Sequence, residues 1–588
     1  MILTKINTLR FFAGLFAPLA FLTSLTFLTG ASSCSGQPLS QKKGFTRQDT
    51  LRGTITPERA WWDVQHYTID VTPDYGSKTI SGTVNMVIKK VGTGATTRLQ
   101  IDLQEPMILD SAFYRVEHKI QKKTTHYPVK FTREGNVYWL ETKEFNNLIA
   151  TSYITEGIGA DDKLTLYFHG KPREAIRPPW DGGWIWTKDK DGRPWMSVAC
   201  QGLGASVWYP CKDIQSDEPD HGALLTMHVP DSLVGVGNGR LIKKGMDSKG
   251  LTTWTWEVKN PINNYNIVPY IGKYVTWHED YNGEKGKLNC NFWVLDYNYD
   301  TAVKQFKQAE QMLKCFEHWF GPYPFYEDGY KLVEAPHLGM EHQSAVAYGN
   351  GFKNGYLGRD LTGTGWGKKW DFIIVHESGH EWFANSITSN DIADMWVHEG
   401  FTNYSETLFT TCEFGVEAGN DYVIGTRKAI RNDIPIIGPY GVNQEGSGDM
   451  YYKGGNMLHT IRNIIADDEK FRQILRGLNK VFYHKTTTSK DVEAYISKEA
   501  GKDFSKVFDQ YLRTTQIPVL EYKVEQHGIS FRFTNCIKGF SMPLKVNVGK
   551  EQWIMPTEEW QSLKLADWFD GKTFVVDSNF YINTKKVE

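Results

Sequence analysis

The sequence lacks an excess of charge of either sign. Its 66 lysines and arginines nearly balance 68 aspartates and glutamates, and the basic residues are scattered rather than clustered. Proteins that bind nucleic acid concentrate positive charge on one surface. The sequence therefore predicts no nucleic-acid partner.

Cysteine pairs of the CxxC type are also missing. The seven cysteines lie far apart, at positions 34, 200, 211, 290, 315, 412 and 536. A zinc site built from cysteines needs closely spaced pairs, so that kind of site is excluded. Disulfides in an oxidising compartment and buried free thiols both remain open, and the spacing assigns no pairing.

Long apolar runs are confined to the N-terminus. Lys5 and Arg10 precede an apolar run at 11–28, and small residues then lead to Cys34. This pattern predicts a secretory signal peptide at 1–33, and hence a protein exported to the bacterial periplasm or cell envelope. The small residues before Cys34 resemble a lipoprotein cleavage site, although Ala31 stands where leucine is usual. Lipid attachment at Cys34 would associate the chain with a membrane; the alternative is an uncleaved single-span anchor.

Length and composition predict several folded domains. A chain of 588 residues is too long for one core, and 40% apolar residues can fill several. Residues 34–54 are polar and are predicted to be a tether. Residues 55–275 show alternating apolar residues and turn signals, which predict an all-β N-terminal domain with a hairpin at 67–88.

The pattern becomes helical in residues 276–515. Apolar residues recur every three or four positions from Val303 to Phe320, before Gly321-Pro322 ends the run. Further helices are expected at 371–386, 396–412 and 451–464. Strand alternation returns in 516–588 and predicts a small C-terminal β-sandwich. The predicted fold class is multidomain α+β, with a mainly α central domain.

A metal-binding motif lies in the helix expected at 371–386. His376-Glu377-Ser378-Gly379-His380 fits the pattern HExxH, in which two histidines one helical turn apart project toward a single ion. Glu377 adjoins the first histidine and is placed to act as general base. A motif this short also arises by chance, and surface histidines are then the alternative.

A third ligand follows on the next predicted helix. Glu399 comes after eighteen residues from His380. Two histidines and one carboxylate leave the fourth position of a tetrahedral zinc ion open, as catalytic sites require. We therefore predict one Zn²⁺ per chain, held by His376, His380 and Glu399. Glu406 is either a partner that steadies a histidine ligand or a solvated carboxylate.

Four motifs together resemble the gluzincin family of zinc aminopeptidases that includes aminopeptidase N and leukotriene hydrolase. The resemblance covers most of the chain from about residue 60. Two of the motifs are the HExxHxW segment and the Glu399 helix. The other two are Gly339-Met340-Glu341-His342, similar to GxMEN when read from Leu338, and Tyr451-Tyr452-Lys453-Gly454, similar to YxKG; Gln201 after Cys200 is a weaker match.

The resemblance implies both a fold and a set of roles. The central domain is expected to be thermolysin-like. Glu341 and Gln201 would hold the free amino group of a peptide, with Gly339 and Met340 in the same substrate-binding segment, and Tyr451 would stabilise the oxyanion. The expected function is removal of N-terminal amino acids from peptides that have a free N-terminus.

Several positions depart from the family pattern. Leu338 and His342 replace a glycine and an asparagine on either side of the segment that carries Glu341. His398 replaces an asparagine beside Glu399 and is expected to be tolerated. Asn443 stands where epoxide hydrolysis requires an aspartate, so we predict no epoxide chemistry.

Two other functions are compatible with the same ligands. A thermolysin-type endopeptidase would cut internal bonds and would also cleave N-acetylated peptides. A surface binding protein on a peptidase fold would not catalyse at all. Retention of Glu377 and Tyr451 beside all three ligands argues against the second alternative.

Overall fold

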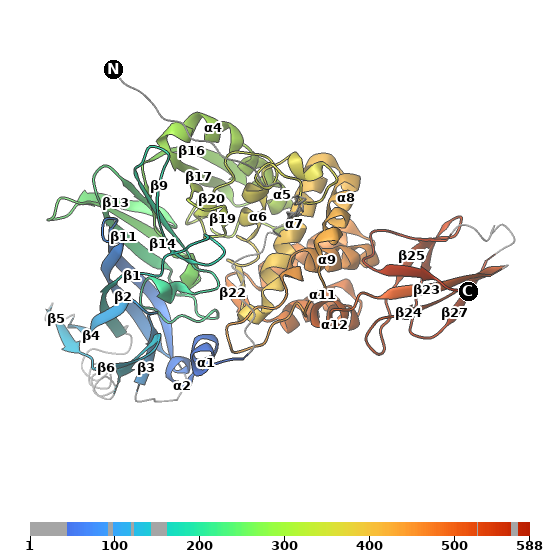
Figure 1. The fold of residues 1–588 in the computed structure, drawn as a ribbon, viewed down its shortest axis with the longest axis horizontal. Helices are drawn as coiled ribbons and strands as arrows, with labels where there is room; N and C mark the ends of the chain where they lie inside the picture. The colour runs from blue at the N-terminus through green and yellow to red at the C-terminus, as the bar shows by residue number, and fades with distance from the viewer. Residues whose placement is uncertain (1–43, 92–97, 119–122, 143–161, 526, 566–573) are drawn as a thin grey trace, which may run out of the picture. The chain divides into compact units, whose positions relative to one another are not determined.

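The computed structural model describes residues 44–91, 98–118, 123–142, 162–525, 527–565 and 574–588 (Figure 1). All of them belong to one compact unit, Ser35–Glu588. The predicted signal peptide, Cys34 and the first part of the tether lie outside the described residues. Within those ranges, no helix combines the length and the apolar character needed to cross a bilayer.

The N-terminal region is built on an eight-stranded sheet with the strand order β13-β14-β11-β1-β2-β8-β4-β5. Strands β1 (Trp62–Asp74) and β2 (Thr79–Lys90) form the predicted antiparallel hairpin, and alternate residues of β1 are buried as expected. The remaining strands of the sheet are β4 (Ile108–His118), β5 (Lys123–Pro128), β8 (Asp162–Gly170), β11 (Ala223–Val229), β13 (Arg240–Met246) and β14 (Thr252–Val258).

A histidine links two strands of this sheet and a turn. His228 on β11 contacts Asp70 on β1 through Nε2 at 3.0 Å and Asp247, in the β13–β14 turn, through Nδ1 at 2.8 Å. Burial alone would lower the pKa of His228, but the hydrogen bonds to both carboxylates raise it above its ordinary value.

Part of the predicted tether is folded, which corrects that prediction. Residues 47–53 form helix α1 (Arg47–Gly53), and Thr46 and Asp49 make a reciprocal capping box at its start. Leu51 is buried against Val137 and Trp139. The buried Leu51, the capping box and the ion pairs of Arg47 with Glu134 and Arg52 with Asp213 hold a segment whose composition is otherwise polar.

Two smaller sheets complete this region. One contains β12 (Val234–Val236), β15 (Tyr270–Gly272), β10 (Pro194–Ala199) and β9 (Gly183–Lys188), and the other contains β3 (Arg98–Asp102), β7 (Val137–Glu141) and β6 (Phe131–Glu134). Gln201 follows directly after β10. Tyr265 lies in a short 3₁₀ turn, η2 (Asn264–Asn266), shortly before β15.

The central region combines helices with a five-stranded sheet. The sheet order is β16 (Tyr274–Gly283), β17 (Gly286–Leu295), β18 (Tyr330–Glu334), β20 (Val346–Tyr348) and β19 (Gly339–Met340). The main helices are α4 (Tyr299–Gln305), α5 (Gln308–Phe320), α6 (Phe372–Gly379), α7 (Trp396–Phe414), α8 (Val416–Thr426), α9 (Tyr452–Ile465), α10 (Asp468–Val481), α11 (Ser489–Ala500) and α12 (Ser505–Arg513).

The helix expected from Val303 to Phe320 is interrupted. The chain breaks between α4 and α5 at Phe306, whose ring packs against Trp277, Phe292 and Tyr348. This aromatic packing, which comes from distant parts of the sequence, accounts for a break that the periodicity did not indicate.

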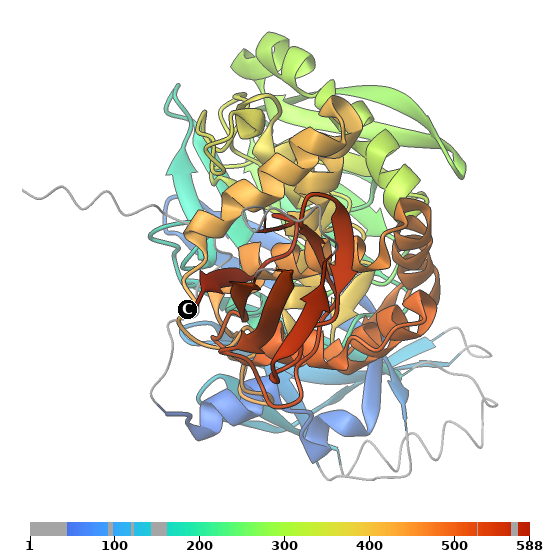
Figure 2. The same cartoon turned by 90° about the vertical axis from the view of Figure 1, so that its right-hand side faces the viewer.

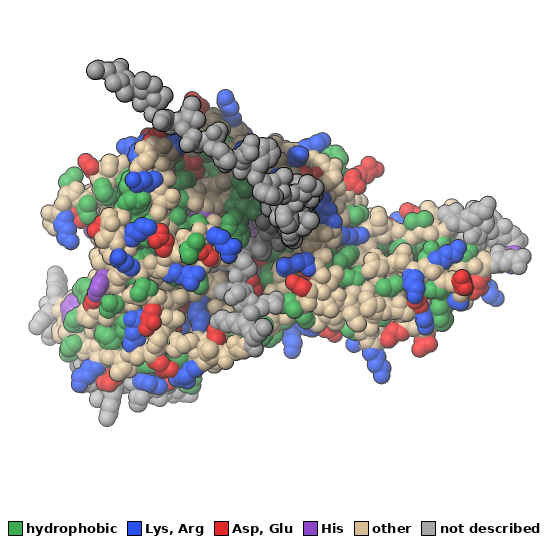
Figure 3. Space-filling model, in the orientation of Figure 1, with side chains coloured by type: hydrophobic (Ala, Val, Ile, Leu, Met, Phe, Trp, Pro, Cys, Tyr) green, Lys and Arg blue, Asp and Glu red, His purple; other side chains and the backbone are tan. Residues whose placement is uncertain are grey.

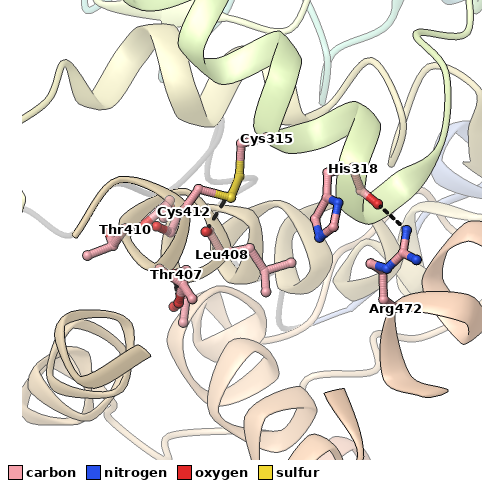
Figure 4. The surroundings of a disulfide bond; sticks show 9 residues. Cys315, His318, Thr407, Leu408, Thr410, Cys412 and Arg472 are labelled. Carbon is pink, nitrogen blue, oxygen red and sulfur yellow. Dashed lines mark hydrogen bonds between the residues drawn. A yellow bond between two sulfur atoms is a disulfide. The ribbon is translucent and has the colours of Figure 1, made fainter. Parts of the chain in front are cut away.

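A disulfide joins two helices of the central region (Figure 4). Cys315 on α5 is bonded to Cys412 near the end of α7, 97 residues further on. The sequence assigned no pairing. Among the described residues, Cys200, Cys211, Cys290 and Cys536 are free thiols, so both alternatives left open by the sequence occur in this chain.

Two small sheets form the C-terminal region, at the opposite end of the colour scale from the N-terminal strands (Figures 1 and 2). Their strands are β23 (Val519–Glu525), β24 (Gly528–Thr534), β25 (Leu544–Asn547), β26 (Glu551–Ile554), β27 (Gln561–Lys564), β28 (Val575–Val576) and β29 (Asn583–Lys586). Apolar residues predicted to face inward, including Ile529, Phe533 and Leu544, are buried. Multidomain α+β architecture is confirmed, while the domain boundaries at 275 and 515 stay predictions.

Positive and negative side chains are interspersed over the face shown in Figure 3. The predicted absence of a nucleic-acid partner stays a prediction.

Candidate metal centre

The first two predicted ligands lie on α6. Asp371 caps this helix, because its carboxylate accepts hydrogen bonds from the backbone N–H groups of Ile373 at 3.1 Å and Ile374 at 3.4 Å. The helix ends at Gly379 rather than at 386, and the chain continues in tight turns. His380 occupies the C-cap, yet its ring still lies beside that of His376, with centroids 5.0 Å apart.

Helix α7 brings Glu399 to the same point. Its Oε2 lies 3.7 Å from His376 Nε2 and 3.3 Å from His380 Nε2. The ligand atoms of the three residues all fall within 4.8 Å of one another, and all three side chains are buried. Glu399 Oε2 accepts no hydrogen bond from the described part of the chain. Two imidazole nitrogens converging on an unsatisfied buried carboxylate oxygen fit a zinc ion.

Each histidine is oriented from behind through its other nitrogen. His376 Nδ1 lies 2.7 Å from Glu406 Oε1, and His380 Nδ1 lies 3.0 Å from the carbonyl oxygen of Phe383 and 3.1 Å from Thr402 Oγ1. Both Nε2 atoms therefore face the centre. Glu406 is fully buried, so it is not a solvated carboxylate but the partner that orients His376.

Glu377 lies at the edge of the centre on α6. Burial raises its pKa to about 7, and the neighbouring histidines act in the opposite direction. A bound dication would favour the ionised form further. A Cβ atom on Gly339 would come within 2.7 Å of Glu377 Oε1 and 2.9 Å of Ile373 Cγ2, so a larger residue there would displace the Glu377 carboxylate.

Glu341 follows β19 and faces the same centre. One ligand atom each of Glu341, Glu377 and His380 lie within 4.8 Å of one another. The Nε2 amide of Gln201 donates to Glu341 Oε1 at 2.5 Å, and the Tyr265 hydroxyl donates to the same oxygen at 2.8 Å. The N-terminal region thus supplies two donors that fix a carboxylate of the central region.

Tyr451 lies opposite, immediately before α9. Its ring is stacked on that of His376, with centroids 5.9 Å apart. Helices α7 and α9 approach closely at two glycines: a Cβ atom on Gly454 would lie 3.1 Å from the Cα of Gly400. The absence of side chains at this crossing brings the start of α9 next to the metal ligands on α6 and α7.

Three of the departures from the family pattern, His342, His398 and Asn443, do not enter the centre. The His342 ring turns away to the hydroxyl of Tyr270, and His398 Nε2 accepts a hydrogen bond from the Ser389 N–H at 2.8 Å. Burial lowers the pKa of His398 to about 3, so its ring is neutral. Asn443 donates to the carbonyl oxygen of Gly202.

Sequence reasoning missed two residues at this site. Tyr265 belongs to no recognised motif, and only its hydrogen bond to Glu341 reveals it. Asn385 donates to the backbone carbonyl of Glu341 at 2.8 Å and holds the same segment. The positions of these two residues in the sequence carried no signal of this role.

The chain is similar to known metallopeptidases. Residues 304–511 match the model of the peptidase family M1 domain. Aminopeptidase B of Mus musculus is 21% identical over 473 residues, which is 76% of this chain and 67% of that protein. Leukotriene A-4 hydrolase of Xenopus laevis is 22% identical over 334 residues, 53% of this chain and 51% of that protein.

Solved structures share the fold. An M1 zinc metallopeptidase from Deinococcus radiodurans, a variant bound to a Tyr-Ser-Ala substrate, superposes with a TM-score of 0.63 at 19% identity, covering 78% of this chain and 96% of that one. The chain spans about half to two thirds of the length of the curated relatives it matches. Residues 304–511, which carry the three converging ligands, are thus similar to a peptidase family M1 domain, and the chain shares the fold of solved M1 zinc metallopeptidases.

Proposed function

We propose that the chain is a zinc aminopeptidase that removes single residues from the N-terminus of peptides. The observation that carries the proposal is the position of Glu341. Its carboxylate lies beside Glu377 and His380. There it would contact the part of the peptide on the N-terminal side of the scissile bond. A fixed carboxylate at this distance selects a terminal ammonium and disfavours a longer, uncharged chain.

The donors to Glu341 prepare it for an ammonium. Gln201 and Tyr265 both donate to Oε1, so the carboxylate is held in one orientation before substrate binds. Burial raises the pKa of Glu341, and these hydrogen bonds favour its charged form. Substrate then meets an oriented carboxyl group and loses little free energy to reorganisation.

The remaining side chains act on the scissile bond. Zinc, when bound by His376, His380 and Glu399, supplies a Lewis acid for the carbonyl and the attacking water. Glu377 accepts a proton from that water at its carboxylate and returns it to the leaving amine. The hydroxyl of Tyr451 donates a hydrogen bond to the oxyanion, a contact whose loss costs about 2.7–4 kcal/mol in other hydrolases.

The proposal is tested with one peptide in two forms, with a free amino terminus and with an N-acetyl group. We expect chelator-sensitive release of the first residue from the free form alone. Glu341→Gln should lower kcat/KM on the free peptide strongly, whereas Glu327→Gln, at an exposed glutamate, should not. Cleavage of both forms would favour an endopeptidase, and cleavage of neither, with zinc bound and several peptide sequences tried, would favour a binding protein.

We propose further that the chain is exported to the cell envelope and attached to a membrane through Cys34. The sequence at 1–34 supports this, and a disulfide between Cys315 and Cys412 is typical of an oxidising compartment. In a bacterial host the mature protein should begin at an acylated Cys34, which measurement of its intact mass would show. The Cys34→Ser variant should be absent from the membrane fraction. An unmodified soluble wild-type protein would contradict the attachment.

A further inference from the structure

A cavity of about 490 Å³ lies behind the segment that follows α6, and none of the predicted metal ligands or substrate-binding residues lines it. Its size lies within the roughly 300–1,000 Å³ that small-molecule sites occupy. It lies between the end of α5, the segment Trp382–Ser386, and one face of α10.

Two arginines of α10 fix the wall of this cavity against the end of α5. Arg472 Nη1 donates to the carbonyl oxygen of His318 at 3.2 Å (Figure 4), and Arg476 Nη1 donates to that of Glu317 at 2.6 Å. Arg476 also forms a paired salt bridge with Glu284 at 2.9 and 2.7 Å. The cavity is therefore bounded by two helices, α5 and α10, that are joined by hydrogen bonds.

The floor of the cavity is apolar and aromatic. Phe320, Pro322, Pro324 and Trp382 contribute to it. The indole of Trp382 is oriented by its own hydrogen bond, because Nε1 donates to the carbonyl oxygen of Gly321 at 3.0 Å. A flat or branched hydrocarbon body would find preformed contact surface here.

The charged side chains of the lining are all positively charged. Lys285, Arg476 and Lys480 line the cavity, and no aspartate or glutamate of the described residues does. The charge of Arg476 is matched by Glu284, whereas the described residues place no carboxylate within ion-pair distance of Lys285 or Lys480. Lys285 Nζ donates to the Tyr483 hydroxyl at 3.3 Å and lies 4.8 Å from the centroid of the same ring. Two unmatched ammonium groups above an apolar floor favour a ligand with one anionic group.

We propose that this cavity binds a small amphipathic organic anion, with an aromatic or branched aliphatic body and a single carboxylate or sulfonate. The body would lie on Pro322 and the ring of Tyr483, which are the partly exposed apolar members of the lining, and the anionic group would meet Lys285 and Lys480. An inorganic polyanion fits less well, because most of the lining is apolar. The proposal does not depend on the peptidase activity.

The site is tested on the zinc-loaded protein with 1-anilinonaphthalene-8-sulfonate, whose fluorescence rises on apolar surfaces. We expect saturable binding, weakened about tenfold or more in Lys285→Glu/Lys480→Glu. Lys490→Glu makes the same type of change on α11, away from the cavity, and should leave the affinity within about twofold of the wild type.

Two further measurements do not depend on that double variant. Gln473→Trp places an indole over the cavity without changing charge and should abolish saturable binding. In the wild type, 4-phenylbutyrate should displace the probe and neutral 4-phenylbutanol should not. Equal binding to all folded variants, or displacement by both compounds alike, would overturn the proposal.

Discussion

The disulfide between Cys315 and Cys412 closes a loop that contains all three predicted metal ligands. Its sequence separation is 97 residues, and all three predicted ligands and Glu341 lie between the two cysteines. In the chain-entropy model a loop of this length restricts the unfolded chain by about 4.7 kcal/mol. This value is an upper limit, because α5 and α7 also pack against each other without the bond.

The perturbation is the double variant Cys315→Ser/Cys412→Ser. At about 2–4 °C per kcal/mol for a domain of this size, the full effect would lower the melting temperature by roughly 10–20 °C. Thermal unfolding followed by fluorescence measures this shift. A reductant should lower the melting temperature of the wild type toward that of the variant and leave the variant unchanged. Peptidase activity at room temperature should survive in both.

Cys536→Ser, which removes a partly exposed free thiol, serves as the control and should melt as the wild type does. An unchanged melting temperature in the double variant would refute the reasoning. An equal response of variant and wild type to the reductant would refute it as well, since the effect would then come from another cysteine.

Four further outcomes are expected. Glu377→Gln should keep zinc, measured by metal analysis, and lose nearly all turnover, because the general base is gone while the ligands remain. Tyr265→Phe should lower kcat/KM on free peptides by roughly tenfold or more, since Glu341 loses one of its two donors. Glu406→Gln should weaken zinc binding by about 10–100-fold in a chelator competition. His228→Asn should lower the melting temperature below about pH 6.5, and by less at higher pH. Because the pKa of His228 is raised in the folded protein, its contribution, under about 1 kcal/mol, is complete below the unfolded pKa of about 6.5 and is lost as pH rises through the folded pKa.

Each of these expectations has a contrary result. Substantial turnover in Glu377→Gln would remove it from the role of base, and unchanged kinetics in Tyr265→Phe would make its hydrogen bond structural. Unaltered zinc affinity in Glu406→Gln would show that His376 needs no support. A melting difference for His228→Asn that does not change with pH would show that its charge contributes nothing.

The residues at the metal centre were predictable where spacing along one helix encodes geometry. His376 and His380 lie one turn apart, so their shared direction follows from the sequence. Gln201, Glu341 and Tyr451 were placed by motif resemblance, and the structure brings all three to one centre. Tyr265 reaches Glu341 across 76 residues, and no local pattern encodes such a contact.

The fold was predictable to a similar extent. Alternation at β1 and β2 gave the hairpin, because one face of each strand must be buried. Composition misplaced α1 in a tether, although the signal was present: Thr46 and Asp49 have the spacing of a capping box. The break at Phe306 and the pairing of Cys315 with Cys412 depend on distant partners and could not be inferred from local sequence.

The support that Glu406 receives has a consequence for metal exchange. Its two oxygens accept hydrogen bonds from Asn403 at 3.1 Å and Tyr422 at 2.6 Å while one of them holds His376. The ligands are therefore held in place by the protein rather than by the ion, unlike those of a small zinc domain whose folding depends on its metal. Protein stripped of zinc should stay folded and take the ion back without refolding, so that reconstitution would be limited by access of the ion and not by rebuilding of the centre.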